Sequence, residues 1–466
     1  MNWIALLLSL TILVATHELG HLLFAKLFHT RVRRYYIFFN PLFSIIKAKK
    51  FGGKWHFLFF NSTTPDSWDE KNLAPEDQDN TLWGLGWVPL GGYCDIAGMI
   101  DETKKAEDLE EVPQPWEYRT KPAWQRLCII SGGVLVNFIS ALLIYGMIFS
   151  TWGKDELPLR SASLGYDYHQ VMIDEGFENG DIILSIDGKD MYELADASKA
   201  LLLDNPRTVS VQRGDSVVDI YMSGHLMERV NNEGVKQLMV YRIPFIVHSA
   251  IAGGNAERAG LMAGDSIVSV DDSAMASFSD ITAVLESHRD QTVQIGFYRD
   301  GQLMSLPVDV SSEGKIGVQR ESSIPRLFSG YRHVDYTFFQ AIPAGISYGW
   351  HTLVGYVSSL KVLFSPGGTK QLGGFKAMAD LFPDSWSWQA FWELTALLAL
   401  ILAFMNIIPI PGLDGGHIVF TLWEIITRRK PSEKVLTVAQ NVGMFLLLAL
   451  MILANGNDIL RWIGLM

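Results

Sequence analysis

Cysteine and positive charge are both scarce in this chain of 466 residues. Its two cysteines, Cys94 and Cys128, are too few for a disulfide framework, and each is expected to be a small buried apolar residue. Lysine and arginine number 38 against 50 aspartate and glutamate, and the net charge of −12 argues against nucleic acid as a partner. Hydrophobic residues make up 48% of the chain, which indicates a protein that is partly membrane and partly soluble.

The N-terminus also lacks the marks of a cleaved signal peptide. No basic residue precedes Trp3, and no small-residue cleavage site follows the apolar run from Trp3 to Phe28. A bilayer crossing needs roughly 20 apolar residues, so we expect a retained transmembrane helix over residues 1–28. Further apolar runs predict membrane helices over residues 127–152, 389–427 and 435–456.

About 240 mostly polar residues separate the second predicted span from the third, and they contain an internal repeat. "NGDIILSIDGKDM" occupies residues 179–191, and "AGDSIVSVDDSAM" occupies residues 263–275. The offset of 84 residues is the size of one small domain. In each copy a Gly-Asp turn is followed by an alternating apolar strand, which predicts two β-rich domains.

The second copy is preceded by "NAERAGLMAGD", a short helix that leads into the turn. This copy resembles a PDZ domain of the form A-G-L-x-x-G-D-x-I, whereas the first copy lacks the A-G-L lead-in. We expect PDZ-like domains over residues 155–240 and 241–322. Two generic small β-rich domains are the alternative interpretation.

Basic residues near the membrane helices predict the orientation of the chain, because they are enriched in cytoplasmic loops. One group follows the first helix and another separates the third from the fourth: Arg31, Arg33, Arg34, Lys47, Lys49, Lys50 and Lys54, then Arg428, Arg429, Lys430 and Lys434. Both loops should be cytoplasmic. The repeat domains and both termini then lie on the opposite, outer side of the membrane.

Two further regions complete the predicted architecture. Residues 29–126 should form a cytoplasmic, membrane-associated region with a β element, because Phe51 to Phe60 alternates and "WVPLGGYCDIAGM" has strand and turn character. Residues 323–388 should form an amphipathic helical region near the periplasmic membrane surface rather than a fifth span. The predicted fold is a multi-pass α-helical membrane protein with four transmembrane helices, two periplasmic PDZ-like α+β domains and a membrane-associated β element.

The first apolar segment contains "HELGH", an unusual motif for a membrane helix. His17 and His21 are four residues apart and share one helical face, so two imidazoles can ligate one Zn²⁺. Glu18 can act as general base on a zinc-bound water, which the metal acidifies. Chance and helix packing are the alternatives, but ionisable residues within a span are functional by default.

Catalytic zinc usually takes a third protein ligand. Within the apolar segments the candidates are Glu393, Asp414 and His417. Glu393 lies near the outer end of its segment, and His417 is better explained by packing or by a hydrogen bond to another ligand. Asp414 follows Pro409 and Pro411 in a segment whose backbone should be broken and accessible.

These motifs together resemble the site-2 protease family, in the bacterial form with tandem PDZ domains. The resemblance covers the full chain through H-E-L-G-H, P-L-G-G-Y at residues 89–93, and N-x-x-P-x-P-x-L-D-G-G-H at residues 406–417. It implies a zinc metalloprotease that cuts substrate helices within the membrane. The implied ligands are His17, His21 and Asp414, with Glu18 as the base.

The resemblance also implies a substrate-binding region and a class of partner. Asn406 would contact the unwound substrate backbone near Pro409 and Pro411, and the β element at Gly91, Gly92 and Tyr93 would align it. Single-pass membrane proteins, such as trimmed anti-sigma factors or remnant signal peptides, would be the substrates, and the protein would be a monomer in the lipid bilayer. The PDZ-like pair would exclude substrates with bulky outer domains.

The chain departs from the family pattern in two places. Gly133 in "SGGVLVNF" stands where the family often has proline, and "QLGGFKAMADLF" has Gly-Phe where Gly-Pro is usual. These differences leave the metal motifs intact.

Two other functions fit parts of the sequence. An envelope scaffold could use PDZ-like domains to bind peptide ends while the metal only holds helices together, but a structural site does not need Glu18. A membrane-anchored zincin acting outside the bilayer would take its third ligand from a soluble helix, which Asp414 disfavours.

Overall fold

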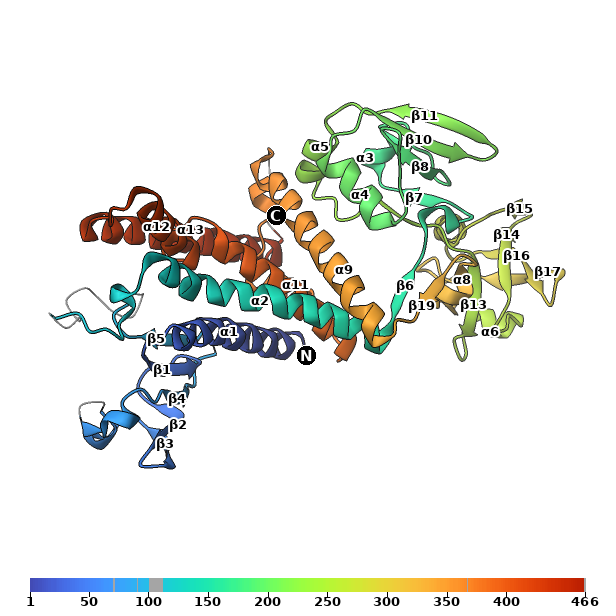
Figure 1. Cartoon of the computed structure of the whole chain (residues 1–466). Coiled ribbons are helices and arrows are strands. Elements are labelled where there is room, and N and C mark those ends of the chain that lie inside the picture. Colours follow the sequence, from blue (N-terminus) through green and yellow to red (C-terminus); the bar gives the residue numbers. More distant parts are fainter. Residues whose placement is uncertain (70–71, 90, 100–111, 367, 465–466) are drawn as a thin grey trace. The chain divides into compact units, whose positions relative to one another are not determined.

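The computed structural model divides into two compact units. The first comprises Met1–Gly153, Asp335–Val357 and Leu372–Met466, and the second comprises Lys154–Val334 and Ser358–Gln371. The structure describes residues 1–69, 72–89, 91–99, 112–366 and 368–464 (Figure 1).

Four helices of the first unit are long and apolar enough to cross a membrane. They are α1 (Asn2–Leu27), α2 (Ala123–Trp152), α11 (Trp388–Ile407) and α13 (Glu433–Trp462). The chain is therefore a membrane protein, and its four candidate spans fall in the four apolar runs of the sequence. α1, α2 and α11 pack together through a shared apolar core (Figure 1), whereas only 6% of the most apolar window of α13 is buried in the protein.

The third apolar run, predicted as one broken membrane helix over residues 389–427, is two separate helices. α11 ends at Ile407, and α12 (Asp414–Thr427) begins after six intervening residues. Pro409 and Pro411 lack the backbone N–H that a continuing helix needs, and Gly412 has a φ of +99°. Only α11 is long enough to span, and Asp414 therefore lies in the first turn of a new helix.

The region predicted as amphipathic contains α9 (Phe338–Ser359), which is not among the four candidate spans. Ala341, Gly345 and Gly349 form its buried stripe at four-residue spacing. A Cβ on Gly345 would lie 2.3 Å from the backbone nitrogen of Gly146, so α9 crosses α2 closely. In the sequence, the short helix α8 (Ile324–Leu327) precedes α9 and the short helix α10 (Phe375–Asp380) follows it. The location of this region at the membrane surface stays a prediction.

A five-stranded sheet lies between α1 and α2 in the sequence. Its order is β3-β2-β4-β1-β5, with β1 (Val32–Ile37), β2 (Ser44–Phe51), β3 (Lys54–Asn61), β4 (Leu82–Leu85) and β5 (Tyr93–Ile96). β1 and β4 are parallel, and the other pairs are antiparallel. Val32 and Tyr35 pack with Leu22 and Ala25, so the sheet is fixed against the end of α1 that follows the histidines.

The longer segment of the second unit, Lys154–Val334, begins and ends with paired strands, β6 (Lys154–Glu156) and β19 (Arg332–Val334). Between them the chain builds one arrangement twice. The first copy runs α3 (Gln170–Ile173), β8 (Ile182–Ile186), β9 (Lys189–Asp190), α4 (Leu194–Leu203), β10 (Thr208–Arg213) and β11 (Ser216–Tyr221). The second runs α6 (Asn255–Ala259), β14 (Ser266–Val270), β15 (Ser273–Ala274), α7 (Phe278–Ser287), β16 (Thr292–Arg299) and β17 (Gln302–Asp309).

An antiparallel strand pair completes each copy. β7 (Tyr166–Tyr168) pairs with β12 (Met239–Tyr241), and β13 (Phe245–Ala250) pairs with β18 (Val318–Arg320). The copies differ in two ways. The pair β7-β12 is a separate two-stranded sheet, whereas β13 also pairs with β14 and so joins the sheet of the second copy. α5 (Leu226–Glu233) lies between β11 and β12, whereas residues 310–317, all described, join β17 to β18 without a helix.

The same polar contact closes the Gly-Asp turn of each copy. The guanidinium of Arg213 donates to Asp181 at 2.7 and 2.8 Å and to the carbonyl of Gly176 at 2.9 Å. Arg299 donates to Asp265 at 2.6 and 2.7 Å and to the carbonyl of Gly260 at 2.9 Å. Both aspartates are almost fully buried, so the repeat that the sequence shows is also a repeat of contacts.

The lead-in that the first copy was expected to lack is present in altered form. Gly176 and Phe177 occupy the positions of Gly260 and Leu261, 84 residues earlier. Both glycines have positive φ, 108° and 92°, and both apolar side chains are buried. Phenylalanine therefore fills the role of leucine in the core of the first copy.

Candidate metal centre

Glycines bring α1 and α2 into backbone contact. A Cβ on Gly20 would lie 2.3 Å from the carbonyl oxygen of Gly132, and a Cβ on Gly132 would lie 2.7 Å from the carbonyl oxygen of Gly20. Small residues at such crossings allow membrane helices to approach closely. At this crossing the rings of His17 and His21 lie directly against α2 at Gly133.

Three possible metal ligands converge beside this crossing. His17 Nε2 lies 3.2 Å from His21 Nε2, and Asp414 Oδ2 lies 3.1 Å from the first and 3.4 Å from the second. The cluster joins the middle of α1 to the first turn of α12, nearly 400 residues away in sequence. Among the described residues these three form a group in which each offers one ligand atom, all within 4.8 Å of one another.

The donor set fits a zinc ion. Asp414 Oδ2 is buried and makes no hydrogen bond within the described part of the chain, although two imidazole nitrogens lie within 3.4 Å. An acceptor oxygen buried without a donor is costly, and a shared cation between the three atoms removes that cost. Two imidazole nitrogens and one carboxylate oxygen are a common zinc ligand set that leaves a fourth position open.

A backbone carbonyl determines which ring nitrogen of His21 carries the hydrogen. His21 Nδ1 lies 3.0 Å from the carbonyl oxygen of Ile129. A carbonyl can only accept, so Nδ1 carries the hydrogen and the lone pair of Nε2 faces Asp414. His21 is therefore already held in the tautomer that binds a metal through Nε2.

Glu18 is half-buried next to the first histidine and interacts electrostatically with His21 and Tyr35. Tyr35 comes from β1, and its hydroxyl donates to the carbonyl of Ala15 at 2.7 Å. Burial, together with the negative charge of Glu18 and the nearby Cys94, raises the pKa of Tyr35 to about 12. The β sheet thus supplies a neutral phenol beside the carboxylate predicted to act as base.

The other predicted site residues lie in three places. Asn406 is buried in the last turn of α11, where its side chain makes no hydrogen bond among the described residues, and Pro409 and Pro411 follow in the broken segment. Gly92 faces α1, since a Cβ there would lie 3.1 Å from Val14 Cγ1, and a Cβ on Gly91 would meet the ring of Phe39.

Tyr93 is directed elsewhere in the sheet. Its ring stacks on Tyr36 with centroids 5.0 Å apart, and its hydroxyl donates to Asn40 at 3.1 Å. Two discarded candidates stay outside the cluster of three. Glu393 accepts a hydrogen bond from Gln389 at 3.0 Å, and His417 lies one turn into α12.

Sequence reasoning assigned no role to three residues that touch the histidines or their partners. A Cβ on Gly133 would lie 2.6 Å from His21 Nε2 and 2.7 Å from His17 Cε1. Asn137, one turn later and fully buried, contacts both His17 and Thr16. The signal available in the sequence was an amide four residues after a glycine in an apolar run.

Apolar helices that carry two imidazoles, two carboxylates and a broken backbone segment define a metal-dependent hydrolase of the membrane. Residues 5–62 and 70–450 match the model of Peptidase family M50. The chain therefore belongs to peptidase family M50, the site-2 protease family, and is a zinc metalloprotease.

Curated relatives of similar length support this assignment. The chain is 24% identical to "Putative zinc metalloprotease NMA0084" of Neisseria meningitidis over 99% of each chain. It is 25% identical to "Metalloprotease MmpA" of Caulobacter vibrioides over 98% of this chain and 95% of that protein.

Proposed function

We propose that this zinc metalloprotease cleaves peptide bonds within the membrane-spanning segments of single-pass membrane proteins. The observation that carries the proposal is the convergence of His17, His21 and Asp414 inside apolar helices. His17 and His21 lie well within a candidate span of 26 residues, not on a soluble domain. A protease acting outside the bilayer would gain nothing from ligands placed there.

The residues at the site have three roles in the proposal: metal ligand, general base and support of the α1 backbone. His17, His21 and Asp414 would hold a zinc ion, which would supply a Lewis acid to acidify water and polarise a carbonyl. Glu18 accepts the proton of the attacking water and donates it to the leaving amine nitrogen. Tyr35, which stays protonated, fixes the backbone of α1 at Ala15 beside that carboxylate.

A helical substrate must be unwound before it can be cut, because its carbonyls are engaged in intrahelical hydrogen bonds. The broken segment at Pro409 and Pro411 offers backbone next to Asp414 for an extended chain. The amide of Asn406 provides both a donor and an acceptor for the substrate backbone. Gly91, Gly92 and Tyr93 lead into β5, and Gly92 lies against α1 one turn before His17.

The proposed setting is the inner membrane of a bacterium, with the protein as a monomer. Basic loops after α1 and between α12 and α13 favour the cytoplasm for both, which puts the two repeat domains in the periplasm. Their shared topology and Gly-Asp turns support PDZ-like domains. There they exclude substrates whose outer domains have not been trimmed, such as intact anti-sigma factors, and admit trimmed ones or remnant signal peptides.

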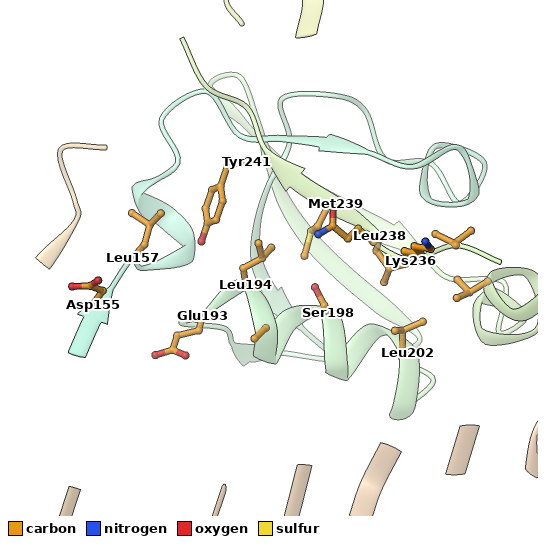
Figure 2. A pocket seen from close by; sticks show the side chains of 14 residues that line it. Asp155, Leu157, Glu193, Leu194, Ser198, Leu202, Lys236, Leu238, Met239 and Tyr241 are labelled. Carbon is orange, nitrogen blue, oxygen red and sulfur yellow. The ribbon is translucent and has the colours of Figure 1, made fainter. Parts of the chain in front are cut away.

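The first repeat domain also contains a groove in which a peptide could bind. Figure 2 shows Leu194, Ser198 and Leu202 on α4 facing Met239 and Tyr241 on β12. The cavity between them has a volume of about 470 Å³. Capture of a peptide end by strand addition to β12 is the alternative to a purely steric filter.

Two substitutions test the proposed chemistry in the purified full-length protein. Glu18→Gln should keep one zinc per chain and lower cleavage of membrane-helix substrates by about 10²–10⁴-fold, because it removes only the base. Asp414→Asn should weaken zinc binding, because a neutral amide replaces an anionic ligand. Zinc content and cleavage of a panel of membrane-helix substrates are the measurements.

Glu393→Gln is the matched control, since it makes the same change in an apolar helix outside the cluster. It should leave both zinc content and cleavage unchanged. Full zinc occupancy with normal turnover in Asp414→Asn would remove Asp414 from the ligand set. Normal cleavage by Glu18→Gln would remove Glu18 as the base.

A further inference from the structure

Two uncharged polar side chains are enclosed between α1 and α2 beside the metal cluster. Asn137 is fully buried, its Oδ1 lies 2.9 Å from Thr16 Oγ1, and its Nδ2 lies 3.4 Å from His17 Nδ1. Thr16 Oγ1 also lies 3.0 Å from the carbonyl oxygens of both Ile12 and Leu13. The contacts form a chain from His17 through Asn137 to the backbone of α1.

The two histidines differ in what fixes their protons. His21 faces a carbonyl, which accepts only, so its Nδ1–H is permanent. His17 faces an amide, which can present either its oxygen or its nitrogen. With Nδ2 toward it, His17 Nδ1 must accept, and the hydrogen then sits on Nε2, which points at Asp414 Oδ2. That tautomer has no lone pair on Nε2 for a metal.

Rotating the Asn137 amide by half a turn resolves the conflict, and the oxygen and nitrogen of an amide have nearly the same shape. Oδ1 then accepts from His17 Nδ1–H, and Nδ2 donates to Thr16 Oγ1. The hydroxyl of Thr16 donates in turn to the carbonyl of Ile12 or Leu13. Every donor faces an acceptor, and the lone pair of His17 Nε2 is free.

We infer that Asn137 is a positioning residue that sets the metal-binding tautomer of His17, with Thr16 holding its amide in the required orientation. The inference rests on the proposed role of His17 as a zinc ligand. Partners of this kind fix the ring and raise the basicity of a ligating imidazole. The competing explanation is a hydrogen bond that only joins α1 to α2, as polar side chains do in membrane proteins.

Zinc affinity in three variants of the full-length protein, compared with a control, separates these explanations. Asn137→Leu, which removes the acceptor, should raise the zinc dissociation constant about 10–100-fold. Asn137→Asp keeps an acceptor for His17 and should lose less than about tenfold in zinc affinity. Thr16→Val should give a smaller loss than Asn137→Leu. The measurement is chelator competition, with the unfolding temperature of the zinc-free protein as a second readout.

Thr395→Val is the matched control. Thr395 is fully buried in α11 and donates to the carbonyl of Phe391 at 2.7 Å, but it is not part of the chain to His17. Its zinc affinity should equal that of the wild type. Asn137→Ala, which adds no bulk, takes the place of Asn137→Leu if the latter does not fold.

Wild-type affinity in Asn137→Leu or Asn137→Ala would overturn the inference. Equal losses in the Leu and Asp variants would also overturn it, because the acceptor would then not matter. A wild-type protein that binds no zinc, or binds it equally after His17→Ala, would instead refute the proposed function.

Discussion

Gly133 is a position at which one methyl group should disable the metal centre. A Cβ there would lie 2.6 Å from His21 Nε2 and 2.7 Å from His17 Cε1, so Gly133→Ala must either displace a histidine ring or move α2 away from α1. Displacements of about 1 Å can cost about 10²-fold in rate. We expect a loss of that size in cleavage and a weaker zinc affinity, measured on the purified protein.

Gly456→Ala in α13 provides the control for this substitution. Nothing lies within 4 Å of a Cβ at Gly456, so the change should cost no activity and should stabilise the helix by up to about 1 kcal/mol. Undiminished zinc affinity and cleavage in Gly133→Ala would show that the helices separate easily at their crossing. That result would contradict the tight packing described between α1 and α2.

For single residues, the metal ligands can be predicted from the sequence more readily than the residues that contact them. His17 and His21 are visible because helical periodicity alone places them on one face, and the structure brings Asp414 to them as the motif indicated. Gly133 and Asn137 act only through a helix more than 100 residues away in sequence. Their roles depend on which faces of α1 and α2 meet, and local patterns do not encode that choice.

An ion pair between α2 and α12 should hold Asp414 in place. Arg126 donates to Glu424 at 2.5 Å, and the two side chains are only 12% and 15% exposed. Removing one partner of a buried pair costs about 3–5 kcal/mol because the other charge is left uncompensated. Glu424→Gln should therefore lower the unfolding temperature and weaken zinc binding through a displaced α12.

The double variant Arg126→Met with Glu424→Leu removes both charges and should recover most of the lost stability. Lys315→Met is the surface control, because its pair with Glu313 is about 70% exposed on each side and should contribute close to nothing. If Glu424→Gln matched the wild type in both unfolding temperature and zinc affinity, α12 would owe its position to apolar packing alone.

The structure changed two expectations about elements, each for a physical reason. The run over residues 389–427 is mostly apolar on both sides of the break, so hydropathy alone does not place the ends of α11 and α12; the missing N–H groups of Pro409 and Pro411 do. The lead-in of the first repeat was overlooked because its amino acids differ from those of the second. Gly176-Phe177 has the same backbone conformation and the same burial as Gly260-Leu261, but phenylalanine replaces leucine. The repeat itself was visible because turn and strand use similar residues in both copies.

For the whole molecule, the proposed filter predicts a gain of function on deletion. β6 pairs with β19, so residues 160–328 can be replaced by a short Gly–Ser linker while both strands are kept. The variant should bind zinc normally and should cleave substrates with untrimmed outer domains, which the full chain rejects. Cleavage of trimmed and untrimmed substrates of otherwise equal sequence is the measurement.

A second variant separates exclusion from capture. Ser198→Trp fills the groove between α4 and β12 and should leave cleavage of trimmed substrates unchanged if the repeat domains only exclude. Loss of that cleavage in Ser198→Trp and in the deletion alike would favour peptide capture. The filter would be refuted if the deletion still rejected untrimmed substrates.

The apolar part of α13 makes few contacts with the rest of the protein. Only 6% of its most apolar window is buried, so most side chains of that window are open to acyl chains in a bilayer and to detergent after extraction. Gly443 nevertheless touches the broken segment, where a Cβ would overlap the carbonyl of Pro411. α13 therefore contacts both the surrounding lipid or detergent and the backbone that precedes Asp414. Preparations with the same sequence and the same zinc content are expected to differ in activity when their detergents differ.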